Sequence, residues 1–364
     1  MNRSLAPELS LLVASCLHIE YEERRLMDSR HLFNLLYYHQ IRPVFLSYIH
    51  ERGIDVNFKQ KLTNDCQHIT FSNMLCAQEL VRVDKLLTAK DITTYAYKGS
   101  VWADWLYGNV GQREFGDIDL LIPKEDFAEA IEVLSNEAGY LADDYRKYLL
   151  ETPKMRKRFF RTDYHIPMLR ETGDSTNVLE AHWEIAYPRL LFTFPSDEWS
   201  RYSEKYMLLG KELNVFQKEY QFLILLVHHG GKEQWKKLKY IADLAAYMFR
   251  YGHLTDWEKV TALAKEKGIY SLLTWSLGIL KALCLPWKKE WPQQIVSVEV
   301  TSLIKQWETA PRLPSNSTWP YFKHGLAIHD GFKHKSALIF EHLKYFSEWQ
   351  LLWHKAAWYK KKQS

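Results

Sequence analysis

A pair of aspartates in a strand-like segment constrains this chain more than any other feature. Asp117 and Asp119 are separated by one isoleucine and followed by an apolar run that ends at Ile122. Successive side chains of a strand point to opposite faces, so we expect both aspartates on one face and the apolar residues on the other. Two carboxylates this close raise each other's pKa unless a cation neutralises them. The pattern therefore predicts a divalent-cation site, and oxygen ligands favour Mg²⁺ or Mn²⁺.

A second strand-like segment, at residues 177–185, also carries an acidic face. Glu180, His182 and Glu184 occupy alternate positions, and apolar residues occupy the positions between them. A strand face made only of carboxylates and an imidazole is not expected to pack into a hydrophobic core. If this strand pairs with the Asp-x-Asp strand, Glu180 supplies a third carboxylate to the predicted cation site.

A strand-to-helix junction precedes the two aspartates. The β-branched and aromatic run at residues 92–97 predicts a strand, and residues 101–107 are expected to be helical. Between them stand Lys98, Gly99 and Ser100. Glycine lets the backbone approach a phosphate, and a helix N-terminus attracts anions. Ser100 is also an ordinary N-cap residue, and both roles can hold at once.

Taken in order, these motifs resemble a known pattern. Gly-Ser after a strand, Asp-x-Asp on the next strand and a lone carboxylate on a later strand resemble the DNA polymerase β-like nucleotidyltransferase superfamily. A longer set resembles the bacterial family known only as uncharacterised nucleotidyltransferases. That set is Lys98-Gly99, a tyrosine near Tyr107, Arg113, Gly116-Asp-Ile-Asp-Leu-Leu and Glu180-x-His182-Trp183.

One later segment resembles the same family. His229-Gly-Gly-Lys232-x-x-Trp235, with Asp243 further on, is similar to its pattern His-Gly-x-Lys-His-x-Trp…Asp. Glu233 stands here in place of the second histidine. The resemblance implies that His229, Lys232 and Asp243 line the cleft from a helical domain. For the adjacent histidines 228 and 229, capping or packing is the more usual role.

The resemblance implies that a nucleoside monophosphate moves from a nucleoside triphosphate to an acceptor, releasing pyrophosphate. Asp117 and Asp119 would bind two Mg²⁺ or Mn²⁺ ions. Glu180 would bind the catalytic ion and take the acceptor's proton. His182 would orient Glu180, or it is a satisfied histidine beside the site. The acceptor is a hydroxyl of a small molecule, a protein or an RNA.

The triphosphate is expected to contact the residues around the junction. The implied contacts are Lys98, Gly99, Ser100 and Arg113, with a surface loop charge as the alternative for Arg113. Three rival functions remain open: a non-catalytic nucleotide-binding or regulatory module, a nucleic-acid-binding protein and a metal-dependent hydrolase.

The expected fold class is mixed α+β. We expect an N-terminal helical region at residues 1–90, a nucleotidyltransferase-type mixed sheet with flanking helices at 91–195 and an all-helical domain at 196–364. A long amphipathic helix is expected at 65–89, and a loop at 311–320. A capping box predicts Thr255 as an N-cap, with Glu258 three residues later.

Composition limits the possible partners only weakly. The net charge of +4 over 364 residues does not demand nucleic acid. A basic stretch at 146–161 would serve a nucleic-acid-binding alternative, although a solvated hairpin flank is the favoured interpretation. The four cysteines lack metal-ligand spacing and predict a reducing, cytoplasmic setting. No signal peptide and no membrane span are predicted.

Overall fold

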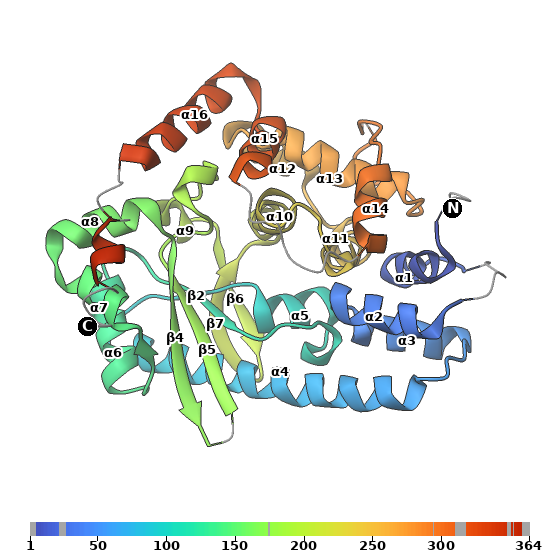
Figure 1. Ribbon diagram of the computed structural model, residues 1–364, viewed down its shortest axis with the longest axis horizontal. Coiled ribbons are helices and arrows are strands. Elements are labelled where there is room, and N and C mark those ends of the chain that lie inside the picture. Colours follow the sequence, from blue (N-terminus) through green and yellow to red (C-terminus); the bar gives the residue numbers. More distant parts are fainter. Residues whose placement is uncertain are drawn as a thin grey trace. The chain divides into compact units, whose positions relative to one another are not determined.

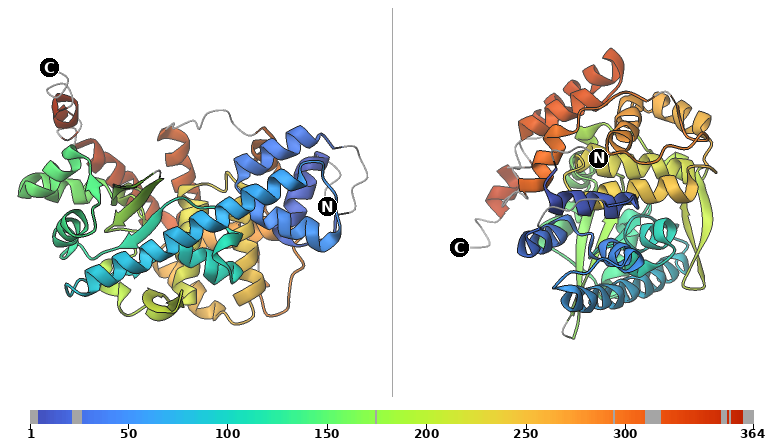
Figure 2. Two further views of the ribbon diagram at one scale, coloured as in Figure 1. Left: turned by 90° about the horizontal axis from the view of Figure 1, so that it is seen from below. Right: turned by 90° about the vertical axis from the view of Figure 1, so that its right-hand side faces the viewer.

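A computed structural model describes residues 5–21, 27–173, 175–293, 295–309, 318–347, 351 and 353–358 (Figures 1 and 2). The chain divides into two compact units. The helical unit comprises the residues up to Leu75, Trp102–Phe115 and Lys218–Ile328. The sheet unit comprises Cys76–Val101, Gly116–Gln217 and the residues from His329 onward. Each unit therefore combines segments that are distant in sequence, and the predicted division into three consecutive domains stays a prediction.

Two helices cross the boundary between the units. Helix α4 (Lys59–Thr88) passes it after Leu75, and α5 (Gly99–Tyr107) passes it after Val101. Figure 2 shows α4 as one continuous helix. It begins six residues before the start that its amphipathic pattern predicted.

The helical unit contains many helices with clear sequence signals at their ends. Asp28 opens α2 by accepting hydrogen bonds from the backbone N–H groups of Arg30 and His31, and Gln40 closes that helix in a left-handed conformation. The helices besides α4 and α5 are α1 (Pro7–Leu17), α2 (Ser29–His39), α3 (Arg42–Arg52), α10 (Lys218–Leu226), α11 (Leu238–Tyr251), α12 (Trp257–Glu266), α13 (Tyr270–Ala282), α14 (Thr301–Thr309) and α15 (Thr318–Ile328). Short 3-10 and π turns lie at Val110–Gln112 and Val227–Lys232.

A buried histidine at the end of α2 connects three segments of the helical unit. His39 is fully buried; its Nδ1 accepts a hydrogen bond from the backbone N–H of Leu238, and its Nε2 donates to the carbonyl of Trp307. Both bonds require the neutral ring. Burial lowers the pKa of His39 to about 3, although the bond to Trp307 opposes this change.

We therefore expect the helical unit to lose stability in acid. The folded-state pKa of His39 lies below the unfolded value of about 6.5. The stabilisation is complete above that value and is lost as pH falls toward 3. Between about pH 7.5 and about pH 5, the free energy of unfolding of wild type should fall by about 2 kcal/mol more than that of His39→Gln. Urea unfolding at both pH values measures this difference, and equal losses in the two proteins would contradict the assignment.

The sheet unit is built on a five-stranded mixed sheet of order β1-β2-β5-β4-β3. Strands β2 and β5 are parallel, and the other neighbouring pairs are antiparallel. Figure 1 shows β2, β5 and β4 side by side. The strands are β1 (Tyr95–Ala96), β2 (Ile118–Leu121), β3 (Leu141–Ala142), β4 (His165–Thr172) and β5 (Ser175–His182). This arrangement confirms the expected α+β fold class.

Helices of the same unit pack around an aromatic core at the end of β5. Trp183 is fully buried, and its ring lies 4.9 Å from that of Phe127, 5.1 Å from that of Phe159 and 4.8 Å from that of Phe160. These partners belong to two helices, which brings the apolar face of β5 into a core. The helices of the unit are α6 (Phe127–Asn136), α7 (Asp144–Glu151), α8 (Pro153–Thr162), α9 (Ser196–Trp199) and α16 (Gly331–Ser347), with a 3-10 turn at Pro188–Leu190.

A β-hairpin lies within the range that the sequence predicted to be all-helical, and that prediction is wrong at residues 203–216. Strands β6 (Ser203–Leu208) and β7 (Lys211–Phe216) pair antiparallel through a two-residue turn. Leu209 and Gly210 both have positive φ angles, 50° and 74°. Two such residues form the tight turn that matches the twist of the strands, but Leu-Gly is not its usual sequence signal.

Three smaller predictions also need correction or restriction. The basic stretch at 146–161 is helical: it lies on α7 and α8, which precede the antiparallel pair of β4 and β5. Asp256, not Thr255, caps α12, because its carboxylate accepts from the N–H of Lys259 while the Thr255 hydroxyl donates to the carbonyl of Tyr251. Of the loop expected at 311–320, residues 311–317 lie outside the described residues and the remainder begins α15.

The described helices contain no candidate for a membrane-spanning segment, since none combines the necessary length with a sufficiently apolar composition.

Candidate active site

The strand register of the sheet unit brings four polar side chains to one face. Strands β2 and β5 align Asp119 with Glu180, and β4 places His165 opposite His182. Aligned residues of neighbouring strands share a face, as do alternate residues of one strand. The pairing of the two acidic strands, expected from their alternation, is therefore present.

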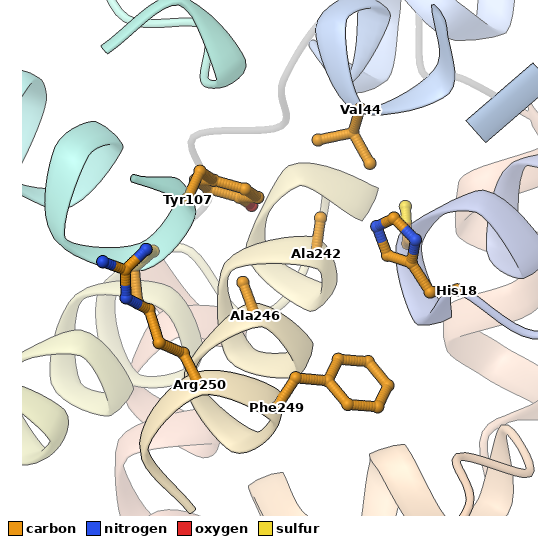
Figure 3. A pocket seen from close by; sticks show the side chains of 9 residues that line it. His18, Val44, Tyr107, Ala242, Ala246, Phe249 and Arg250 are labelled. Carbon is orange, nitrogen blue, oxygen red and sulfur yellow. The ribbon is translucent and has the colours of Figure 1, made fainter. Parts of the chain in front are cut away.

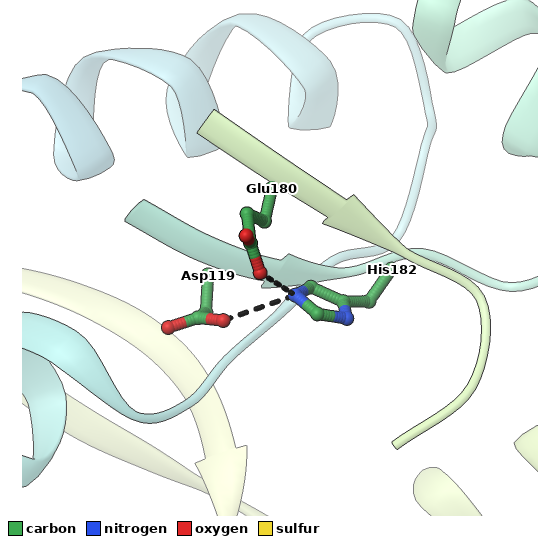
Figure 4. A group of neighbouring side chains, drawn as sticks. All are labelled: Asp119, Glu180 and His182. Atoms are coloured by element: carbon green, nitrogen blue, oxygen red, sulfur yellow. Dashed lines mark hydrogen bonds and ion pairs between the residues drawn. The ribbon is translucent and has the colours of Figure 1, made fainter. Parts of the chain in front are cut away.

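His182 holds the two carboxylates together. Its Nε2 lies 3.0 Å from Asp119 Oδ1 and 3.3 Å from Glu180 Oε2 (Figure 4). Because both neighbours are carboxylate oxygens, Nε2 carries the proton and donates to them. His182 is completely buried, Asp119 is 5% exposed and Glu180 is half-buried. Glu180 is thus the most exposed member of a cluster that is otherwise buried in the sheet.

A lysine neutralises the buried aspartate. Lys98 Nζ lies 2.9 Å from Asp119 Oδ1, and both side chains are almost fully buried. Burial alone would lower the pKa of Lys98, but the negative charge of Asp119 outweighs burial and raises it. Burial alone would raise the pKa of Asp119, but Lys98 and His182 hold it well below its usual range. Both groups are therefore charged across the physiological pH range.

Glu180 is also kept ionised. Burial and the negative charge of Asp119 each raise the pKa of the Glu180 carboxyl. The hydrogen bond from His182 lowers it, and the net pKa lies below its ordinary value. His165 Nε2 lies 3.6 Å from Glu180 Oε1 on the other side. A carboxylate with a lowered pKa is a poor proton acceptor near neutral pH but a good cation ligand.

Aromatic rings fix the orientation of His182. The ring of His165 stacks on it at 5.1 Å, and the rings of Tyr97 and Tyr164 lie 5.4 Å and 5.3 Å away. The Lys98 ammonium also lies over the Tyr97 ring, 4.4 Å from its centre. His165 and Tyr97 did not emerge as site residues from the sequence. The available signal for His165 was the alternation of its strand, which places it on the face opposite Ile166 and Met168.

The junction that leads into α5 adopts an unusual backbone conformation. Lys98 and Gly99 have consecutive positive φ angles of 53° and 35°, and α5 begins at Gly99. A left-handed conformation is uncommon for a lysine and costs free energy unless the surroundings hold it. Here the ion pair with Asp119 provides that restraint. Ser100 follows, 4% exposed, at the N-terminal end of the helix.

Asp117 lies just outside the strand. Strand β2 begins at Ile118, so strand alternation does not fix the half-buried Asp117 side chain as the sequence suggested. Asp117 is not part of the potential ligand group described next. Its predicted role as a metal ligand stays a prediction.

The cluster fits a divalent cation by its donor chemistry. Asp119, Glu180 and His182 each offer one ligand atom, and these three atoms lie within 4.8 Å of one another. No second group of this kind occurs in the part of the chain that the structure describes. Two carboxylates and one imidazole suit Mn²⁺ and other transition metals as well as Mg²⁺. A cation that took Asp119 Oδ1 as a ligand would displace the ammonium of Lys98.

Arg113, His229 and Asp243 come together inside the helical unit. Arg113 Nε and His229 Nε2 each lie 2.9 Å from Asp243 Oδ2, and the Tyr107 hydroxyl donates to Oδ1 at 2.9 Å. Asp243 and His229 are at most 1% exposed, and Arg113 is 6% exposed. Burial would raise the pKa of Asp243, but Arg113 and His229 hold it well below its usual range. We call these four residues the buried network.

The remaining predicted residue, Lys232, ends the π turn that contains His229. It is half-buried, its Nζ lies 3.7 Å from Glu233 Oε1, and its carbonyl accepts a hydrogen bond from the Tyr321 hydroxyl. Burial lowers the pKa of His229 to about 4, so its ring is neutral when it donates to Asp243. These contacts give the segment a structural role within the helical unit.

Comparison with known proteins gives a family but few relatives. No curated protein matches the chain. The solution structure of the antibiotic-resistance factor ANT(2'')-Ia is 16% identical with a TM-score of 0.36, and the match covers 55% of this chain and 96% of that one. The crystal structure of an antigenic nucleotidyltransferase-like protein from Paracoccidioides brasiliensis is 11% identical with a TM-score of 0.32. That match covers 57% of this chain and 91% of the other.

The sequence profile of one family matches residues 26–284, well over half of the chain. Its description is "Uncharacterised nucleotidyltransferase". The matched range contains both acidic strands, the junction before α5 and the buried network. This chain belongs to the family of uncharacterised nucleotidyltransferases.

Proposed function

We propose that the protein transfers a nucleoside monophosphate from a nucleoside triphosphate to an acceptor hydroxyl and releases pyrophosphate. The observation that carries the proposal is the cluster of Asp119, Glu180 and His182, aligned across two parallel strands beside the glycine-serine junction. Phosphoryl-type transfer needs charge neutralisation and positioning more than covalent chemistry from the protein. The membership of the chain in a nucleotidyltransferase family supports the same reaction class.

Each residue of the cluster has a distinct role in this proposal. Asp119 and Glu180 would hold the cation, with His182 as a third ligand or as the group that orients both carboxylates. When bound, Mg²⁺ or Mn²⁺ would neutralise charge on the transferred phosphate. The lowered pKa of Glu180 favours its role as a ligand over a role as the base. Asp117 is proposed as an additional ligand from its position next to β2.

Lys98 would move from Asp119 to the triphosphate. In the structure its ammonium is the counter-charge of Asp119 at 2.9 Å. A bound cation at Asp119 would repel the ammonium and release it toward the phosphate oxygens. The N–H groups and hydroxyl at Gly99 and Ser100 would bind the same phosphates at the start of α5. Arg113 is engaged in the buried network, so we leave it out of this phosphate site.

The proposal is tested by following labelled phosphate. The full chain is incubated with each α-labelled nucleoside triphosphate, Mg²⁺ or Mn²⁺ and a cell extract. We expect label in a product that forms together with pyrophosphate, and the chemical nature of that product identifies the acceptor class. Free labelled monophosphate without an adduct would instead indicate a hydrolase. Triphosphate binding without turnover would indicate a non-catalytic module.

The competition between Lys98 and a cation makes a separate prediction. Lys98→Met removes the ammonium that occupies Asp119 Oδ1, so Mn²⁺ should bind the variant about tenfold more tightly in the absence of nucleotide. Titration followed by the electron paramagnetic resonance of free Mn²⁺ measures the affinity. The exposed Lys211 of β7 provides a control, since Lys211→Met should leave the affinity unchanged. Weaker binding by Lys98→Met would contradict the competition.

A further inference from the structure

The helical unit contains a pocket that the proposed reaction does not use. Its volume is about 460 Å³, within the range of sites for small organic ligands. Nine residues line it: Cys16, His18, Val44, Leu106, Tyr107, Ala242, Ala246, Phe249 and Arg250 (Figure 3). They come from the end of α1, from α3, from α5 and from α11. All of them belong to the helical unit.

The spacing of small residues on α11 explains the hollow. Ala242, Ala246 and Arg250 are four residues apart, so they lie on successive turns of one helix face, with Phe249 beside them. Alanine at two successive turns leaves space that larger side chains would fill. Val44 and Leu106 add further apolar walls. The interior therefore suits an aromatic or aliphatic group.

One polar wall of the pocket is held rigid. The Tyr107 hydroxyl donates to Asp243 Oδ1 at 2.9 Å, and Asp243 is in turn fixed by Arg113 and His229. The buried network thus positions the tyrosine ring that faces the pocket. The network would therefore serve ligand binding as well as stability, because a wall that is already ordered reduces the conformational entropy lost on binding.

The pocket carries one permanent charge, and it is positive. None of the nine lining residues is acidic. Arg250 is exposed, and within the described residues its guanidinium has no carboxylate in ion-pairing distance and no hydrogen-bond partner. The guanidinium lies against Gly108, where an added β carbon would be 2.8 Å from Arg250 Nη1. Gly108, with φ of 73°, therefore gives Arg250 the room to point along the pocket wall.

We propose that this pocket binds a small amphipathic anion, with its apolar body against Ala242, Ala246 and Phe249 and its carboxylate or phosphate on Arg250. A guanidinium binds both kinds of anion through paired hydrogen bonds. The His18 imidazole, on the other side of the pocket, bounds the space available to the ligand. The site requires neither nucleotide nor cation, so its failure would leave the proposed nucleotidyl transfer untouched.

Binding of 3-phenylpropionate to the full chain tests the proposal. Saturation-transfer NMR without nucleotide should show saturable binding at one site. The neutral isostere 3-phenylpropanamide should bind at least about tenfold more weakly, because it loses the charged hydrogen bonds to Arg250. Phenyl phosphate should compete with 3-phenylpropionate, which distinguishes a general anion site from one that accepts carboxylates alone.

Variants separate the pocket from nonspecific binding. Arg250→Gln should weaken 3-phenylpropionate by at least about tenfold and leave the propanamide unchanged. Ala246→Phe fills the hollow and should abolish binding of both, with circular dichroism showing that the fold is kept. Arg30→Gln, at an exposed position of α2, is the matched control and should bind as wild type does. Equal affinity for the two probes, unchanged binding in Arg250→Gln, or no saturable binding by wild type would overturn the proposal.

Discussion

Asp119→Asn is expected to reduce nucleotidyl transfer by more than about a hundredfold. Losing a residue that only hydrogen-bonds to a metal ligand reduces metal affinity or activity by about ten- to a hundredfold. Asp119 would contact the cation directly, so its loss should have a larger effect. The amide keeps the shape of the carboxylate but removes its charge. The same change leaves the buried ammonium of Lys98 without its counter-charge, and breaking such a pair costs about 3–5 kcal/mol of stability. Transfer of labelled phosphate and thermal unfolding must therefore be measured together.

A double variant separates catalysis from stability. Lys98→Met combined with Asp119→Asn removes both charges, so it should recover much of the stability while transfer stays lost. Glu184→Gln is the matched single control. Glu184 lies just after β5, is paired with Lys124 and should tolerate the change with little loss of transfer. Full activity in Asp119→Asn would rule out the proposed active site.

Arg113→Met is expected to destabilise the protein by about 3–5 kcal/mol. Arg113 is 6% exposed and is the main counter-charge of Asp243, which is 1% exposed. Its loss leaves a buried carboxylate whose hydrogen bonds come from two neutral donors, the Tyr107 hydroxyl and the His229 ring. Urea unfolding measures the change. Arg201→Met, at an exposed position, should alter stability by no more than about 0.5 kcal/mol.

The same variant decides between two roles for Arg113. If the arginine stabilises the helical unit, Arg113→Met combined with Asp243→Leu should restore part of the lost stability, because both charges are then removed together. The KM for the triphosphate should change little in any variant that remains folded. A large rise in KM at unchanged stability would instead favour the triphosphate contact implied by the family resemblance.

The sequence was most informative where the signal was local and repeated. Two segments with alternating acidic residues predicted two strands, and their shared chemistry predicted the pairing that aligns Asp119 with Glu180. The alternation did not reveal where β2 begins, so Asp117 was placed within a strand that starts one residue later. His165 was missed because its contact with the site depends on the register between β4 and β5.

Long-range partners and unusual turns could not be predicted in this way. Arg113 and Asp243 are 130 positions apart, and no periodicity connects them. The β6–β7 hairpin depends on a left-handed leucine, a conformation that few leucines adopt. Two adjacent residues before α12, Thr255 and Asp256, are both of types that can cap a helix. The Thr255 hydroxyl instead forms hydrogen bonds with the Tyr247 hydroxyl and the Tyr251 carbonyl, and Asp256 caps α12.

The interleaving of the two units has a consequence for biosynthesis. The helical unit needs residues as late as Ile328, and the sheet unit takes its last segment from His329 onward. While a ribosome is still translating the Asp-x-Asp strand, α10 to α15 do not yet exist, so α1 still lacks α11, the helix on which it packs most extensively. Neither unit is complete until residues beyond Ile328 have been translated, and in nascent chains stalled before residue 218 the early segments of the helical unit should remain sensitive to protease.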